Sequence, residues 1–277
     1  MFKLISIFNL IVLSLSVRAT SDEVCSIDSI FAELADEKQL IMFGEIHGTK
    51  EMPAYVAKVL CFLSKNKRPI KIGLEYLPDQ LPLINRYIES AGLEGDKKAL
   101  IGSSYWSRQY QDGRTSQAMF NLVEQIRVEQ HAGKDVEVFL FDDQSSVNRD
   151  KAMAVRIIEE LNNDPDTLHV LITGNIHSQI TKGVPWDADY MTMGAYVSER
   201  KIEFASILLT HLGGSAWICT TYCEETTLNS KEDQSLQTDK GVLKVKGNNN
   251  KKHHYHVSVG KINSSIPAYQ NLQQIKE

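Results

Sequence analysis

The sequence lacks the motifs of two large groups of α/β enzymes. It has no GxxxxGK[ST] phosphate-binding loop and no GxSxG nucleophile elbow, so neither a P-loop nucleotidase nor an α/β-hydrolase is indicated. It also lacks a basic excess, because 35 acidic residues outnumber 30 basic residues and give a net charge of −5. Nucleic-acid binders usually carry a basic excess or stripe, and we therefore expect no nucleic-acid partner.

Long apolar runs are equally scarce. The run at residues 4–17 is shorter than the roughly 20 residues that a transmembrane helix needs, and no later segment is long and apolar enough to span a bilayer. Lys3 precedes this run, and Val17 and Ala19 provide small residues before a cut after position 19. This pattern predicts a signal peptide at 1–19 and a secreted or periplasmic chain, with an uncleaved N-terminal anchor as the alternative.

Cysteines number only four, at positions 25, 61, 219 and 223. Export permits disulfides, and four cysteines allow three pairings that sequence cannot separate. No CxxC pair or Cys/His knuckle is present, so a zinc knuckle is not expected. We favour a local bridge between Cys219 and Cys223.

Residues 20–277 are expected to form a single α/β domain. Short apolar runs predict buried strands, and helical spacing of apolar residues predicts helices between them. Such alternation is typical of a mostly parallel central sheet with helices on both faces. The expected strands are 40–43, 70–74, 136–141, 169–172 and 202–209, and the expected helices are 53–63, 81–88, 116–129 and 149–161. A polar segment at 224–252 predicts a flexible loop, and 254–262 predicts a last C-terminal strand.

Polar residues gather where the predicted strands end. These groups are Glu45 with His47, Glu75, Asp142 with Asp143, Asn175 with His177, and His211. The carboxyl ends of parallel strands share one edge of the sheet, where ligands bind in α/β folds. We therefore expect these groups to meet in one site.

The candidate catalytic residues are Glu45, His47, Glu75 and His177. His47 can take a proton near neutral pH, and Glu45 can orient its ring; the alternative is a polar turn that caps a helix. Glu75 ends an apolar strand, which favours a raised pKa or a bound cation, or else a structural salt bridge. His47, Glu75 and His177 together suit a divalent first-row metal ion, although they can equally act as base and acid without metal.

Four further residues are candidates for substrate binding, namely Arg149, Arg114, Asp143 and Trp106. Arg149 can clamp a carboxylate or stabilise an oxyanion, or it can pair with Asp143. Arg114 lies in a loop that leads into a helix, and Trp106 can form an aromatic wall, although core packing is the commoner fate of such a residue. The histidine tract at 253–256 is interpreted as solvated and not as a metal site.

The motifs resemble those of a known superfamily. Residues 44–51, GEIHGTKE, resemble the opening motif of erythromycin esterase-like proteins with one residue fewer between Glu and His, and also the start of ChaN-like haem-binding lipoproteins. Residues 149–154 and 174–185 resemble the second half of the ChaN-like pattern. Both groups belong with the Tiki proteases and TraB-like proteins, and the resemblance covers most of residues 39–210. Its shared positions correspond here to His47, Glu75 and His177.

What the resemblance implies is divided. Esterase-like members hydrolyse a lactone ester with the first-motif His as base, Tiki members are metal-dependent peptidases, and ChaN-like members bind haem. Gly48 stands where ChaN usually has an Asp, and no second His follows the first motif, which counts against haem. The sequence therefore predicts an exported hydrolase of ester or amide bonds in a small molecule or peptide, with a divalent metal as the favoured cofactor over haem. A haem- or metal-binding protein is the alternative.

Overall fold

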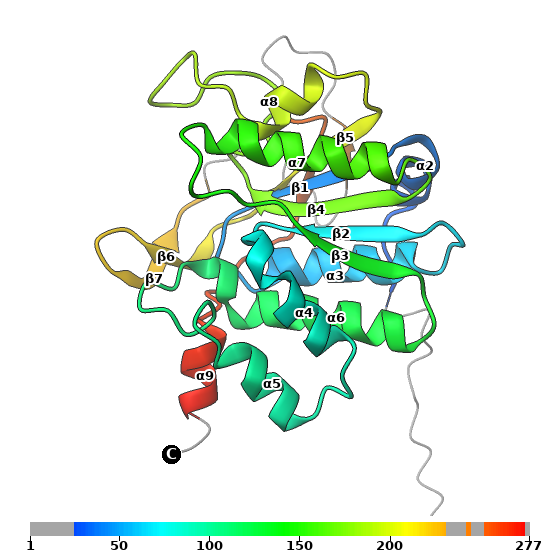
Figure 1. The fold of residues 1–277 in the computed structure, drawn as a ribbon. Helices are drawn as coiled ribbons and strands as arrows, with labels where there is room; N and C mark the ends of the chain where they lie inside the picture. The colour runs from blue at the N-terminus through cyan, green and yellow to red at the C-terminus, as the bar shows by residue number, and fades with distance from the viewer. Residues whose placement is uncertain (1–24, 231–241, 245–251, 275–277) are drawn as a thin grey trace, which may run out of the picture.

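The computed structural model describes residues 25–230, 242–244 and 252–274. A seven-stranded sheet forms its centre (Figure 1). Its strands in spatial order are β3 (Val136–Leu140), β2 (Ile70–Leu74), β4 (Leu168–Gly174), β1 (Leu40–Glu45), β5 (Phe204–Thr210), β9 (Tyr255–Ser258) and β8 (Val242–Lys244). Neighbouring strands are parallel except β8, which runs antiparallel to β9. The predicted α/β class, with a mostly parallel sheet and C-terminal strands, is confirmed.

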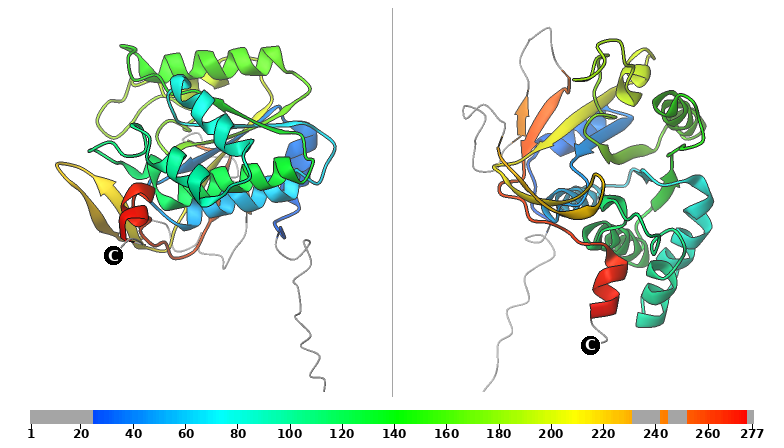
Figure 2. Two further views of the ribbon diagram at one scale, coloured as in Figure 1. Left: turned by 60° about the horizontal axis from the view of Figure 1, so that its bottom comes forward. Right: turned by 90° about the vertical axis from the view of Figure 1, so that its left-hand side faces the viewer.

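Helices cover both faces of the sheet (Figure 2). Side chains alternate along each strand, so Ile41 and Phe43 of β1 belong to one core, and Leu40 and Met42 belong to the other. The larger core includes residues of α2 (Ile30–Glu37), α3 (Glu51–Leu63), α4 (Leu81–Ile88), α5 (Glu94–Ile101), α6 (Gln117–His131) and α9 (Ala268–Gln274). The smaller core is closed by α7 (Arg149–Asn163) and α8 (Met193–Ser198).

Local sequence explains where the central elements begin and end. All six residues of β1 are buried, as expected for a parallel strand that is covered on both faces. Asn148 caps α7 as predicted, because its side-chain oxygen accepts a hydrogen bond from the Lys151 amide at 3.0 Å. Short 3₁₀ turns at Pro78–Gln80 and Gly113–Thr115 complete the connections.

The predicted loop at 224–252 is wrong in part. Residues 224–228 belong to β7 (Cys223–Leu228), which pairs with β6 (Gly214–Cys219) in a separate antiparallel hairpin, and 242–244 form β8. β7 carries few apolar side chains because most of its residues are exposed or half-buried, so the strand leaves little periodic signal in the sequence. The rest of the predicted loop at 231–241 and 245–251 lies outside the described residues.

The predicted signal peptide at 1–19 also lies outside the described residues. Within the part of the chain that the structure describes, no helix has the length and apolar character needed to cross a membrane.

Two disulfides are present. Cys219 pairs with Cys223 and closes the β6–β7 hairpin, as predicted. Cys25 pairs with Cys61 and ties the segment before α2 to α3. All four cysteines are therefore bridged.

Candidate functional site

Strand register brings together the turns at 44–47 and 174–177, each of which has the sequence Gly-x-x-His. Glu45 at the end of β1 is in register with Gly174 at the end of β4. Leu74 of β2 is in register with Ile172 of β4, which places Glu75 beside Thr173. The four candidate catalytic residues therefore lie at one edge of the sheet, as the positions of the predicted strand ends require.

His47 is held between two carboxylates. Its Nδ1 lies 2.8 Å from Oε1 of Glu45, and its Nε2 lies 3.6 Å from Oε2 of Glu75. Burial of the ring acts to lower the pKa of His47, but the two carboxylates outweigh burial and raise that pKa to about 10. His47 is therefore an imidazolium at neutral pH, in which Nδ1 donates to Glu45 and Nε2 forms an ion pair with Glu75.

Glu75 stands at the centre of the site and is buried. Its Oε2 accepts hydrogen bonds from the Thr173 hydroxyl at 2.7 Å and the Gly174 amide at 2.8 Å, and its Oε1 accepts one from Arg149 at 2.7 Å. Burial acts to raise the pKa of Glu75, but the charge and hydrogen bond of His47 lead the contributions that hold it well below the usual range. Both oxygens are fully engaged, so Glu75 fixes its neighbours in position.

His177 forms a second imidazole–carboxylate pair. Its Nδ1 lies 2.8 Å from Oδ1 of Asp150, while Nη1 of Arg149 lies 2.9 Å from its Nε2. A guanidinium can only donate, so Nε2 accepts and Nδ1 carries the hydrogen that is donated to Asp150. Asp150 is fixed in turn by the Tyr190 hydroxyl at 2.6 Å and the Met193 amide at 2.7 Å.

Gly174 leaves the space that the two rings share. A β-carbon at this position would lie 3.4 Å from Nε2 of His47 and 3.4 Å from Cδ2 of His177. Both imidazoles therefore border the same small volume, which only a glycine keeps open.

Two arginines balance the negative charge of the site. Arg149 donates to Asp142 at 2.7 Å, and Arg114 donates to Asp142 at 2.8 Å and also binds Asp112. Arg149 was expected to reach the cleft or to pair with Asp143; it contacts Glu75 and His177 and pairs with Asp142. Arg114 lies 3.6 Å from Glu75, so both predicted arginines belong to the cluster.

Two predicted substrate contacts are not part of the cluster. Trp106 is fully buried and packs edge-on against Tyr76 and Phe120, so it forms core and cannot form a wall of the cleft. Asp143 accepts hydrogen bonds from Ser145 and Ser146 and from Arg156, and it therefore organises the turn before α7.

Two other histidines, His211 and His253, are also placed differently from the prediction. His211 accepts a hydrogen bond from the Gly213 amide and does not line the pocket beside His47. His253 was interpreted as solvated, but it is 3% exposed and lies 3.0 Å from the Ser178 hydroxyl behind the Gly174 turn. Burial lowers the pKa of His253 to about 3, so this ring is neutral.

His47, Glu75 and His177 do not form a metal-ligand set. Arg149 lies between Glu75 and His177 and contacts both, and a cation would have to displace its positive charge. Among the described residues, no group of three His, Cys, Asp or Glu side chains is arranged to hold a metal ion. The haem alternative needs an axial ligand such as His177 or a Tyr. Both ring nitrogens of His177 have partners, and Tyr110 is the tyrosine that lines the pocket.

A pocket of about 600 Å³ opens over the cluster. Glu45, His47 and His177 line it from the sheet end, and Tyr110, Trp217 and Leu228 line it from the loop before α6 and from the β6–β7 hairpin. A larger groove of about 770 Å³ between α3 and α6 is lined by no imidazole and by one carboxylate, Glu225, so it has less to offer for catalysis.

The β6–β7 hairpin is joined directly to the turn that carries His47. Gly48 has a positive φ of 80°, and its carbonyl accepts hydrogen bonds from the amides of Trp217 at 2.9 Å and Ser265 at 2.8 Å. On the other side, a β-carbon at Gly113 would collide with the backbone of Gly48. The His47 turn is therefore clamped between the hairpin and the loop that carries Asp112 and Arg114.

Asp150, Tyr190 and Asp112 were missing from the predicted set of site residues. Asp150 directly follows Arg149 in the first turn of α7, and that position was the available signal. Tyr190 lies in a connection between β4 and α8 for which the sequence offered no periodic pattern.

Comparison with known proteins gives fold-level matches. No family model matches the chain, and no curated protein matches its sequence. The structure is similar to that of an erythromycin esterase in its open conformation (13% identity, 76% of this chain and 81% of that chain, TM-score 0.57). It is also similar to a Bacillus cereus protein (12%, 90% and 94%, TM-score 0.58) and to a succinoglycan biosynthesis protein (11%, 86% and 91%, TM-score 0.61). These matches show that the chain shares the fold of these three proteins.

Proposed function

We propose that the chain is a hydrolase of ester or amide bonds. The observation that carries this proposal is the convergence of two imidazole–carboxylate pairs on the space beside Gly174. One pair presents a hydrogen-bond acceptor and the other presents a donor, which are the two groups that a hydrolysis needs. The neighbour named an erythromycin esterase supports the same class of reaction by its name.

In this proposal His177 is the general base. Asp150 holds the hydrogen of His177 on Nδ1, which leaves Nε2 to accept a proton from water as the water oxygen attacks the carbonyl carbon. Water reaches Nε2 once Nη1 of Arg149 exchanges His177 for the carbonyl oxygen of the substrate, while Nε and Nη2 keep their bonds to Asp142 and Glu75. Arg149 then stabilises the negative charge that develops on the carbonyl oxygen, an effect worth roughly 3 kcal/mol.

His47 is the general acid in the same proposal. Its raised pKa of about 10 keeps a proton on Nε2, which it donates to the leaving alcohol or amine as the bond to carbon breaks. This differs from the role of base that the family resemblance implies. The reason is that Glu45 and Glu75 both face this one ring. Solvent then removes the proton from His177 and returns one to His47.

We also propose that the chain is exported after removal of residues 1–19. Pairing of all four cysteines supports this, because disulfides persist in oxidising compartments. N-terminal sequencing of the protein recovered from medium or periplasm is expected to start at residue 20. Recovery of a chain that retains residues 1–19 would contradict the proposal.

The test of function is turnover of a panel of simple esters and amides by wild type and His47→Ala. We expect the variant to be at least about 100-fold slower, whereas His131→Ala, which changes an exposed histidine at the end of α6, keeps wild-type rates. A chelator is expected to leave the rates unchanged, since Arg149 occupies the place of a cation. Equal turnover by wild type and His47→Ala would overturn the proposal.

A further inference from the structure

The pocket over the cluster has two unlike surfaces. The ends of β1 and β4 and the turns after them contribute the polar residues Glu45, His47, Asn175 and His177, together with Ile46 and Ile176. The β6–β7 hairpin and the loop before α6 contribute Tyr110, Trp217, Ile218 and Leu228, which we call the apolar wall, together with Asp112 and Cys219. Ligand sites usually combine a few polar groups with a larger apolar surface, and here both line one cavity.

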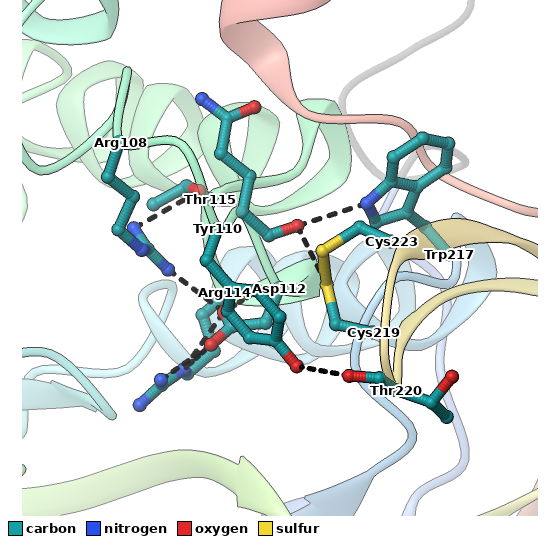
Figure 3. Close-up of a disulfide and its surroundings, with 10 residues drawn as sticks. Arg108, Tyr110, Asp112, Arg114, Thr115, Trp217, Cys219, Thr220 and Cys223 are labelled. Carbon is teal, nitrogen blue, oxygen red and sulfur yellow. Dashed lines mark hydrogen bonds and ion pairs between the residues drawn. A yellow bond between two sulfur atoms is a disulfide. The ribbon is translucent and has the colours of Figure 1, made fainter.

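Two residues of the apolar wall, Trp217 and Tyr110, join the hairpin to the neighbouring loop through backbone carbonyls (Figure 3). Trp217 donates from its indole nitrogen to the carbonyl oxygen of Gln111 at 3.0 Å, and Sγ of Cys219 lies 3.3 Å from the same oxygen. The Tyr110 hydroxyl donates to the carbonyl of Thr220 at 3.3 Å, and the Cys219–Cys223 bridge closes the hairpin beside it. The hairpin and the Tyr110 loop therefore form one preorganised surface.

Tyr110 is the most accessible member of the apolar wall. Its side chain is 51% exposed although its ring lines the pocket, so a bound molecule would cover apolar surface that is now in contact with water. His47 and His177 line the same pocket, so the carbonyl of such a molecule would meet the two imidazoles there. An apolar group on the wall would thus orient the scissile bond toward Gly174.

We propose that the apolar wall binds a large apolar group on the acyl side of the substrate. The chain then prefers esters or amides of bulky aromatic or aliphatic acids over those of small acids. This inference rests on the proposed hydrolase function, since it names the substrate class of the same site.

The experiment compares methyl acetate with methyl 2-naphthylacetate, which share methanol as leaving group and differ in the apolar group. Proton release is followed for wild type, Tyr110→Ala, Tyr110→Phe and Tyr222→Ala. Tyr222 is the matched control, because it lies at the tip of the hairpin, is 77% exposed and does not line the pocket. Binding of 2-naphthylacetate, the product acid, is measured separately by calorimetry.

We expect wild type to favour the naphthyl ester, and Tyr110→Ala to lower kcat/KM for it about tenfold while methyl acetate changes by less than about twofold. Tyr110→Phe keeps the ring and should keep the preference, and Tyr222→Ala should match wild type. If kcat/KM of Tyr110→Ala falls equally on both esters, or does not fall, the proposed role of the apolar wall is wrong, whereas the hydrolase proposal is unaffected.

If wild type hydrolyses neither ester nor any other member of the panel, the hydrolase proposal fails. Binding of 2-naphthylacetate then tests separately whether the apolar wall binds an apolar group. Binding of 2-naphthylacetate that weakens about tenfold in Tyr110→Ala supports the wall as an apolar binding surface. Absence of binding to wild type overturns it.

Discussion

The His47 and His177 turns share a Gly-x-x-His sequence but have opposite surroundings. Each ring binds a buried carboxylate through Nδ1 at 2.8 Å, Glu45 in the first case and Asp150 in the second. Beyond that pair they diverge, because Nε2 of His47 faces the Glu75 carboxylate whereas Nε2 of His177 faces the Arg149 guanidinium. The same local motif therefore holds a proton on one Nε2 and a lone pair on the other.

The two carboxylates also differ in how firmly they are held. Both oxygens of Asp150 are hydrogen-bonded, through His177, Met193 and Tyr190. Oε2 of Glu45 is buried and has no hydrogen-bond partner among the described residues. The proton state of an imidazole is thus set by its distal neighbour, and its rigidity by the partners of its carboxylate.

Loss of the proposed base should give the largest effect. His177→Gln is expected to lower kcat roughly 1,000-fold, because it removes the imidazole nitrogen that takes the proton of the attacking water. Steady-state hydrolysis of the best ester measures this, with His131→Gln as control. The two roles would be reversed if His177→Gln stays active and if the pH profile of His47→Gln no longer shows the step that reports deprotonation of the general base.

Filling the shared space should come next. Gly174→Ala is expected to lower kcat/KM at least about 100-fold, since its β-carbon would stand between both imidazoles at ordinary contact distance. The midpoint of thermal unfolding should change little. Gly95→Ala in α5, where a β-carbon meets open space, is the matched control. A fully active Gly174→Ala protein would show that the rings act separately.

The charge of His47 should be visible in stability. Its pKa is raised from 6.5 to about 10 on folding, so its contribution is complete below pH 6.5 and is lost as pH rises toward about 10. Urea unfolding should show wild type losing roughly 3 to 4 kcal/mol more than His47→Gln between pH 6.5 and about 9.5. Parallel slopes in the two proteins would mean that Glu45 and Glu75 do not hold this proton.

The smallest effect concerns the support of Asp150. Tyr190→Phe removes one hydrogen bond to Oδ2, and we expect kcat to fall about fivefold, equivalent to about 1 kcal/mol. The exposed Tyr222→Phe should leave kcat unchanged. An unchanged rate in Tyr190→Phe would imply that the His177–Asp150 pair is no more rigid than the His47–Glu45 pair.

Strand-end reasoning predicted the centre of the site because it depends on topology alone. Glu45, Glu75 and His177 follow apolar runs, and parallel register then forces their ends to one edge. The exchange of roles between the two histidines was not predictable, since it depends on which side chain faces each Nε2. Arg149 reaches His177 from α7, and no spacing in the sequence encodes that contact.

The β7 strand and the burial of His253 were not predicted for a different reason. β7 has the composition of a solvated loop because most of its residues stay exposed or half-buried even when paired. His253 follows two lysines, yet its ring packs beside Ser178 beneath the Gly174 turn. Polar composition predicts exposure only on average, and long-range packing decides the single residue.

The anchors of the β6–β7 hairpin pass through the main chain. The amides of Trp217 and Ser215 donate to the carbonyls of Gly48 and Ile262, whatever side chains the hairpin carries. Ile218 and Leu228 line the pocket and form no side-chain anchor described above, so evolution or a protein engineer can exchange them while the hairpin keeps these backbone bonds. The hairpin can therefore present new side chains beside the two imidazole–carboxylate pairs without losing its position.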